Sequence, residues 1–216
     1  MTNDLIPFSV DSLPAVAVED LKDLSKQSDY LPRLQMYGCS ADVVKEGKFP
    51  GGHWACVQGD ELEDLGATVD IIPLNYRMKA IDFTGKDVVQ YYDKESSGYK
   101  EVASKNGKGF MHGPVFIVLE RTTGRLMELY FGSKSGRREA PKLRPFLEKR
   151  MPCTLSCRLK KGDNTYHVPV VSKCSEPFIG DFDAEYITSE VTKFMAPKLG
   201  PEIVAPEEAA KSGRAR

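Results

Sequence analysis

Residues 115–131 read VFIVLERTTGRLMELYF, and this stretch decides the fold class. Two apolar runs, 115–120 and 126–131, flank Thr122-Thr123-Gly124, a pattern that is typical of a β-hairpin. A second pair of β-type runs, 154–160 and 166–171, flanks residues 162–164 in the same way. The chain is therefore predicted to be mainly β.

Strand signals also precede the first hairpin. Residues 31–37 alternate, 54–57 form a short apolar run, and 68–83 are followed across a Thr-Gly-Lys turn by 88–92. Pro73 predicts a bend, a bulge or an edge position in the long strand. Residues 93–114 are polar and rich in glycine, and we expect them to form a long loop.

Helical patterns are short. We expect a brief helix at 41–46, a helix that begins near Arg144 because Pro145 cannot lie mid-helix, and a final helix at 183–195. A helix inserted before the last two strands matches the OB-fold, a five-stranded barrel that binds oligonucleotides. Other small β-barrels or sandwiches would give a similar element order. The predicted organisation is an N-terminal arm at 1–30, one OB-like domain with an appended C-terminal helix at 31–196, and a disordered tail at 197–216.

The composition excludes several classes. The longest strictly apolar run in the 216 residues, 115–119, is far shorter than the roughly 20 residues that a membrane span needs. Acidic residues and prolines in the first thirty positions do not fit a secretory signal. Five cysteines without a CxxC motif indicate a reducing compartment. We expect a cytoplasmic protein with no membrane contact and no cofactor.

The net charge of -1 hides an asymmetry along the chain. Residues 121–161 hold 12 Lys or Arg against 3 acidic residues, whereas residues 1–70 hold 5 against 13. A strongly basic segment is typical of a polyanion-binding surface. The alternative is that the acidic N-terminal third pairs with this segment, and whether that third competes with a ligand stays open.

Rings interleaved with cations suit single-stranded nucleic acid, since bases stack on rings while cations contact phosphates. The candidate phosphate-binding residues are Arg77, Lys79, Lys134, Arg137, Arg138, Lys142 and Arg144. The candidate base-stacking residues are Trp54, Tyr76, Tyr91, Tyr92, Tyr99, Phe110 and Tyr130. Because strand side chains alternate, one ring of the pair Tyr91-Tyr92 faces outward, and the sequence leaves open which one.

The glycine-rich segment 132–138, GSKSGRR, is the sharpest local feature. Glycines let backbone N–H groups converge on an oxyanion, and three cations surround them. The spacing is not that of a Walker A loop. A mobile basic turn is the alternative interpretation.

Signals for catalysis are weak, and we expect no enzyme. Cys153 and Cys157 lack a second ligand pair for zinc. Asp70 and Asp82 would lie about 40 Å apart on an unbroken strand, too far to share a metal. No nucleophile–base pair can be assembled from the sequence.

The segments Tyr76-Arg77-Met78-Lys79, Tyr91-Tyr92 and 132–138 resemble the single-stranded-DNA-binding proteins of bacteriophages, over roughly residues 54–172. The resemblance implies an OB-fold domain that binds DNA without strong sequence preference, in the cytoplasm of a bacterial or infected host cell. Proteins of that family often end in an acidic, partner-recruiting tail, whereas this chain ends in cations, so the resemblance does not extend to recruitment through the tail.

The expected function is therefore sequence-independent binding of single-stranded DNA, protecting or organising it in replication or recombination. A second copy of the chain is the other partner that we consider. The alternative is a structural or assembly protein, for example of a virion, that uses the β-domain for subunit contacts. The choice between DNA and RNA, the site size and the oligomeric state stay open.

Overall fold

The computed structural model describes residues 31–59, 61–105, 109–161, 165–174, 182–198 and 200–204. The predicted N-terminal arm, 1–30, lies outside the described residues, as does the tail from residue 205 onward.

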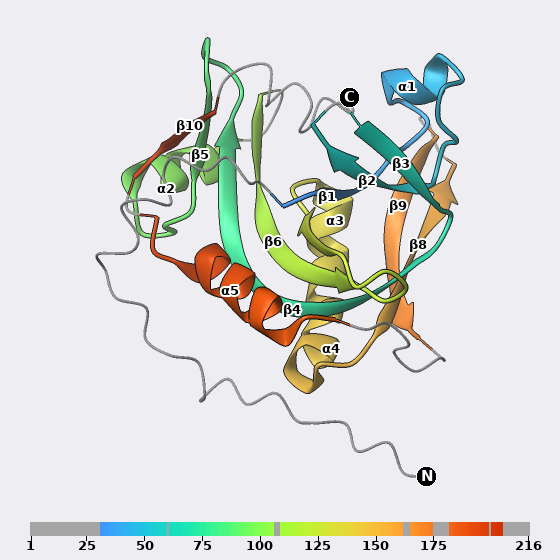
Figure 1. The fold of residues 1–216 in the computed structure, drawn as a ribbon. Coiled ribbons are helices and arrows are strands. Elements are labelled where there is room, and N and C mark those ends of the chain that lie inside the picture. Colours follow the sequence, from blue (N-terminus) through green and yellow to red (C-terminus); the bar gives the residue numbers. More distant parts are fainter. Residues whose placement is uncertain are drawn as a thin grey trace. The chain divides into compact units, whose positions relative to one another are not determined.

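The described residues form one ten-stranded sheet that curls into an open half-barrel (Figure 1). Eight strands follow the order β10-β5-β4-β6-β7-β1-β2-β3, and β8 pairs with β4 and β9. The pairing of β1 with β7 is parallel, and the other pairings are antiparallel. The strands are β1 (Arg33–Met36), β2 (Trp54–Gln58), β3 (Glu61–Gly66), β4 (Val69–Asp82), β5 (Val88–Tyr91), β6 (Phe110–Glu120), β7 (Leu126–Tyr130), β8 (Cys153–Lys160), β9 (Tyr166–Lys173) and β10 (Glu202–Val204).

Short helices cover the sheet. They are α1 (Asp42–Lys45), α2 (Ser97–Ser104), the continuous run α3 (Lys134–Glu139), η4 (Ala140–Leu143) and α4 (Arg144–Lys149), and α5 (Ala184–Met195). Side-chain caps begin three of them: Ser96 for α2, Ser133 for α3 and Asp183 for α5 each accept a hydrogen bond from a backbone N–H of the first turn.

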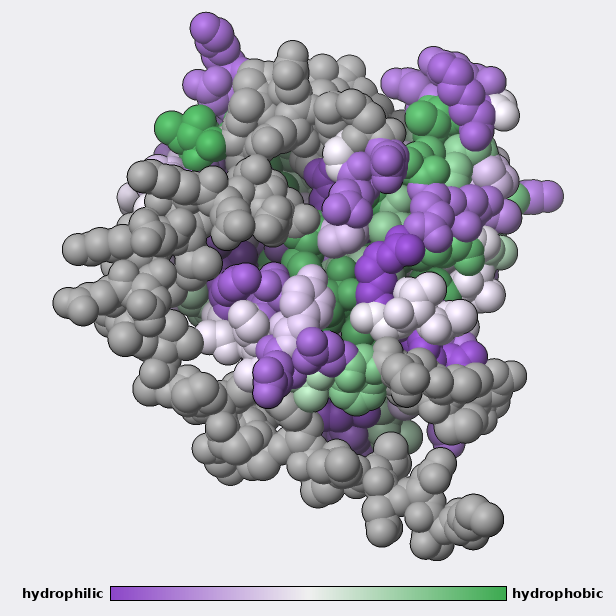
Figure 2. All heavy atoms as spheres, in the orientation of Figure 1, coloured by the Kyte–Doolittle hydropathy of each residue, from purple (hydrophilic) through white to green (hydrophobic). Residues whose placement is uncertain are grey.

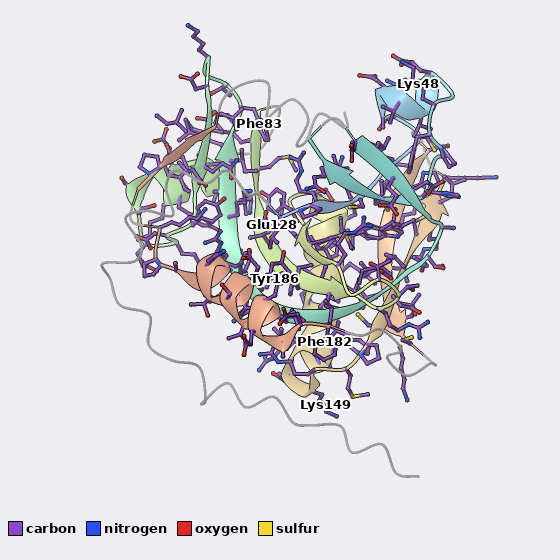
Figure 3. The ribbon with its side chains drawn as sticks, in the orientation of Figure 1. Lys48, Phe83, Glu128, Lys149, Phe182 and Tyr186 are labelled. Carbon is purple, nitrogen blue, oxygen red and sulfur yellow. The ribbon has the colours of Figure 1, made fainter. Side chains whose placement is uncertain are left out.

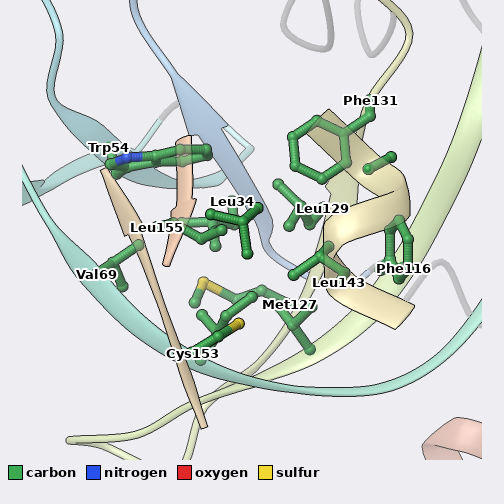
Figure 4. Packing of buried hydrophobic residues seen from close by; sticks show 14 of the residues in the cluster. Leu34, Trp54, Val69, Phe116, Met127, Leu129, Phe131, Leu143, Cys153 and Leu155 are labelled. Atoms are coloured by element: carbon green, nitrogen blue, oxygen red, sulfur yellow. The ribbon is translucent and has the colours of Figure 1, made fainter. Parts of the chain in front are cut away.

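Strand β6 is buried on both faces and divides two cores. Phe116 and Val118 point into the main core, which Figure 4 shows with Trp54 and Leu143. Val115, Ile117 and Leu119 pack instead against Ile187, Val191 and Phe194 of α5. Alternate side chains of a strand point to opposite faces, so the unbroken apolar run of β6 serves both cores.

The mainly β prediction is confirmed, and so are its three hairpins and the final helix. β4–β5, β6–β7 and β8–β9 each pair as antiparallel neighbours. The register between β4 and β6 shifts between Pro73 and Asn75, so the irregularity expected at Pro73 is present. The helix expected at 183–195 is α5.

Several expectations need correction. Within the described residues the sheet has ten strands and is open, with β10, β3 and β9 each paired on one side only, so it is not a five-stranded barrel. The supposed loop 93–114 contains α2 and the first residues of β6. The basic helical segment begins at Lys134, ten residues before the expected start, because Ser133 caps it. Residues 202–204, expected in a disordered tail, form β10 along β5.

Candidate nucleic-acid interface

The structure distributes the predicted site residues over several places. Trp54 is only 1% exposed, in the main core, and Tyr99 is on the buried face of α2. Tyr91 and Phe110 pack into the same small cluster as Tyr99. The prediction of base stacking is therefore wrong for Trp54 and Tyr99, whose rings are buried in packing, whereas Tyr91 and Phe110 are half-buried and stay predictions.

Four predicted residues do meet, on the α5 side of the sheet. The Arg77 guanidinium carbon lies 4.0 Å from the centre of the Tyr92 ring, and the Lys79 ammonium lies 5.5 Å from it. Lys79 also lies 5.7 Å from the Tyr130 ring, and Lys198 lies 4.5 Å from Tyr92. We call Arg77, Lys79, Tyr92, Tyr130 and Lys198 the cation–ring cluster.

The electrostatics of this cluster show an enclosed site. Burial lowers the pKa of Lys79, against the opposing effect of the Glu128 and Glu202 carboxylates. Burial, followed by those same two carboxylates, raises the pKa of Tyr92. Lys198 pairs with Glu202 at 3.1 Å. The cluster's cations are thus engaged by rings and carboxylates, which leaves a base little access to the Tyr92 ring.

The visible part of the α5 side carries a mixed surface. Where grey atoms do not cover it, Figure 2 shows hydrophobic residues beside hydrophilic ones. Glu128 lies between α5 and β1 in Figure 3 and adds negative charge there. This side therefore lacks the uniform basic character that a phosphate backbone favours.

Tyr76 is different, because its ring is 47% exposed. It stacks on Phe116 of the adjacent strand with ring centroids 5.5 Å apart and planes inclined by 28°. Phe116 belongs to the main core, so Tyr76 lies on the α3–α4 side of the sheet. Arg144, at the start of α4, interacts electrostatically with Tyr76. An exposed ring held from below by a buried ring is a suitable stacking surface for a base.

The glycine-rich segment is not a loop around an oxyanion. Ser133 caps α3 by accepting a hydrogen bond from the Gly136 N–H, so that residues 134–138 are helical. Arg137 donates to the backbone carbonyls of His112 and Gly132, which fixes its guanidinium against the sheet. The prediction of Arg137 as a leading phosphate contact is thereby weakened, whereas Arg138 is exposed.

Internal pairing neutralises part of the basic segment. Arg121 pairs with Asp70 and Arg125 with Glu63, and both carboxylates come from the acidic N-terminal third. Lys142 pairs with Glu139, and Arg144 with Glu148, within the helical segment itself. Pairing with the acidic N-terminal third therefore accounts for Arg121 and Arg125, but not for Lys142 and Arg144.

Other exposed cations have no acidic partner among the described residues. On the helical segment these are Lys134, Arg138 and Lys149, the last at the end of α4 in Figure 3. We call these three residues together with Tyr76 and Arg144 the α3–α4 surface. From Lys134 to Arg150 the helical segment holds seven basic residues and two acidic ones, so it remains strongly positive after its ion pairs are counted.

A second exposed basic surface lies at the end of the β8–β9 hairpin. Lys160 lies directly opposite Tyr166, which is 47% exposed, and Arg158 and Lys161 are exposed beside them. These cations belong to the basic segment 121–161, whereas no signal in the sequence marked Tyr166. The hairpin itself was predictable, yet the register that sets Tyr166 against Lys160 was not.

Within the described residues, no three or more His, Cys, Asp or Glu side chains gather in a way that could hold a metal ion. Over the same residues, no helix has the length and apolar character to cross a membrane. Asp70, once considered as a metal ligand, binds Arg121 and Thr154 instead.

Comparisons with protein-family models, with curated proteins and with solved structures gave no match.

Proposed function

We propose that this protein binds single-stranded nucleic acid through the α3–α4 surface. The observation that carries the proposal is the exposed Tyr76 ring, stacked on Phe116 and next to Arg144. A base stacked on the open side of Tyr76 would contribute about 1–3 kcal/mol, and stacking of this kind tolerates any base.

Phosphates along the same strand would contact the exposed cations of the helical segment. Lys134, Arg138 and Lys149 supply positive charge that no carboxylate of the described residues neutralises. Such contacts release counterions and make the affinity depend on salt. The hairpin surface with Lys160 and Tyr166 offers the same combination of cation and ring for a second stretch of the strand.

The proposed role is to protect or organise single strands in replication or recombination, in the cytoplasm and without a cofactor. The binding mode would differ from that of an OB barrel, in which strands 2–3 and two loops hold the ligand. Here one strand residue provides the stacking surface and a run of short helices provides the charge.

The test is fluorescence polarisation of a labelled thirty-nucleotide single strand, titrated with the full chain over a salt series. The triple variant K134Q/R138Q/K149Q should lower the slope of log K against log salt by about 2, at roughly 0.7 per lost phosphate contact. A matched triple variant, K45Q/K86Q/K94Q, removes the same charge from exposed positions away from the α3–α4 surface. Absence of binding at low salt, or equal effects of the two variants, would refute the proposal.

Assembly through sheet edges is the second candidate function. β3 and β10 stand at the two ends of the sheet order, and Ile203 of β10 is 67% exposed. An exposed edge strand is a template for pairing with another chain. This function predicts stable oligomers in sedimentation at all salt concentrations, and a monomer at micromolar concentration would exclude it.

A further inference from the structure

A thiol and an imidazole meet where three distant segments converge. Cys39 lies in the connection between β1 and α1, and its Sγ is 3.2 Å from Nδ1 of His167 on β9. Cys157 of β8 lies on the other side of the Gly51-Gly52 turn, with its Sγ 2.7 Å from the carbonyl oxygen of Gly52. Both thiols are free and half-buried.

Gly52 allows this approach. Its φ is +88°, and a Cβ there would lie 2.8 Å from Cys157 Sγ and 2.8 Å from Cδ2 and Nε2 of His167. Only glycine adopts this conformation readily and leaves that space empty. The turn therefore holds the imidazole between two thiols that have different surroundings.

The two cysteines differ in what their sulfurs contact. Cys157 donates its S–H to a backbone carbonyl, and burial, followed by the neighbouring Cys39, raises the pKa of the Cys157 thiol. Cys39 instead faces a ring nitrogen that can accept its proton. Because the thiolate is the nucleophilic form of cysteine, the imidazole neighbour favours reaction at Cys39.

Access favours the same residue. Ser40, next to Cys39 in the chain, and Gly51, opposite it, are both exposed. The other three cysteines, Cys56, Cys153 and Cys174, are buried at 8% exposure or less.

We propose that Cys39, with His167 as its proton acceptor, is a site of covalent modification by small electrophiles, in particular hydrogen peroxide. The Cys39 thiol transfers its proton to Nδ1 of His167, and the thiolate sulfur attacks one peroxide oxygen. An S–O bond forms as the O–O bond breaks. The departing hydroxide takes the proton back from the imidazolium, so that the products are Cys39 sulfenic acid and one water molecule.

The test measures the rates of alkylation of individual cysteines by iodoacetamide in the native full chain, from pH 5 to 9, by peptide mass spectrometry. At pH 7 Cys39 should react about tenfold faster than Cys157, which serves as an internal control in the same chain. In the variant H167Q the Cys39 rate should fall by about the same factor. With peroxide, dimedone should label Cys39 before any other cysteine.

Equal rates at Cys39 and Cys157 in the unaltered chain would overturn the proposal, and this comparison depends on no variant. A Cys39 rate that H167Q leaves unchanged would also overturn it, because the imidazole at 3.2 Å would then take no part in removing the thiol proton. The reaction does not depend on nucleic-acid binding, so the proposed function and this site fail or succeed separately.

Discussion

The carboxylate of Asp70 and the guanidinium of Arg121 form an ion pair, with Oδ2 3.1 Å from Nε. Asp70 stands at the start of β4, and Arg121 directly follows β6, so the pair joins the strands at the end of their ladder. Thr154 of β8 donates its hydroxyl to the other oxygen of Asp70 at 2.5 Å. One carboxylate thus connects β4 with β6 and β8, the strands that bound the main core.

Replacing Asp70 by alanine should therefore destabilise the fold. Arg121 is only 10% exposed at its side chain and would lose this carboxylate, which for a largely buried pair costs about 3 kcal/mol. Urea unfolding followed by circular dichroism measures the change. Glu148→Ala is the control, since it breaks the exposed pair with Arg144 and should have little effect. An equal decrease in the free energy of unfolding in both variants would contradict the prediction.

Gly113 should not tolerate a side chain. A Cβ at this position of β6 would lie 2.1 Å from the carbonyl oxygen of Phe131, a backbone atom that cannot rotate away. Gly113→Ala should lower the free energy of unfolding by about 1–3 kcal/mol, the range for overpacking. Gly38→Ala is the matched control, because nothing lies within 4 Å of the Cβ it would add. Thermal unfolding that does not distinguish the two variants would contradict the stated packing.

The hairpins could be predicted because the residues that specify each of them are close together in the sequence. The apolar runs at 115–120 and 126–131 and the turn between them are contiguous, and the pairing of Val115 with Tyr130 follows from closing that turn. The parallel pairing of β1 with β7 joins residues almost one hundred positions apart. Nothing in either strand specifies that partner, so the five-stranded barrel was wrong although the strand content was right.

The candidate site, too, could be predicted only in part from the sequence. The sequence marked Tyr76 and Trp54 as equivalent rings, but Trp54 is 1% exposed and Tyr76 47%. The difference arises because β2 lies against the main core, whereas Tyr76 lies at its margin near α4. Likewise, Arg137 and Arg138 are neighbours in sequence, and only the helix that Ser133 begins turns one toward the sheet and the other toward solvent.

Glu120 should make the stability depend on pH below neutrality. Burial would raise the pKa of Glu120, but hydrogen bonds from the hydroxyl and N–H of Thr123 and from the N–H of Thr122 outweigh it and hold the pKa below its ordinary value of 4.5. The unfolded chain then takes up a proton first as the pH falls. The stabilisation is complete above about pH 5 and is lost as the pH falls through the folded pKa.

The comparison of wild type with Glu120→Gln tests the direction of this pH dependence. The difference in free energy of unfolding should be largest at pH 7 and should shrink between pH 5 and pH 3, as measured by urea unfolding at each pH. Glu148→Gln controls for the removal of one exposed carboxylate. A difference that grows toward acid pH would mean that burial dominates at Glu120.

Tyr76 should contribute to strand binding through its ring alone. Tyr76→Ala should weaken binding of the thirty-nucleotide strand by about 1–3 kcal/mol without changing the salt slope, because no cation is lost. Tyr76→Phe should bind like the wild type, since the stacking surface is kept. Tyr186→Ala removes a ring of similar exposure, 50%, from α5 on the other side of the sheet and should leave the affinity unchanged. If Tyr186→Ala weakened binding as much as Tyr76→Ala, the nucleic acid would have to contact the α5 side. The α3–α4 surface would then not be the interface.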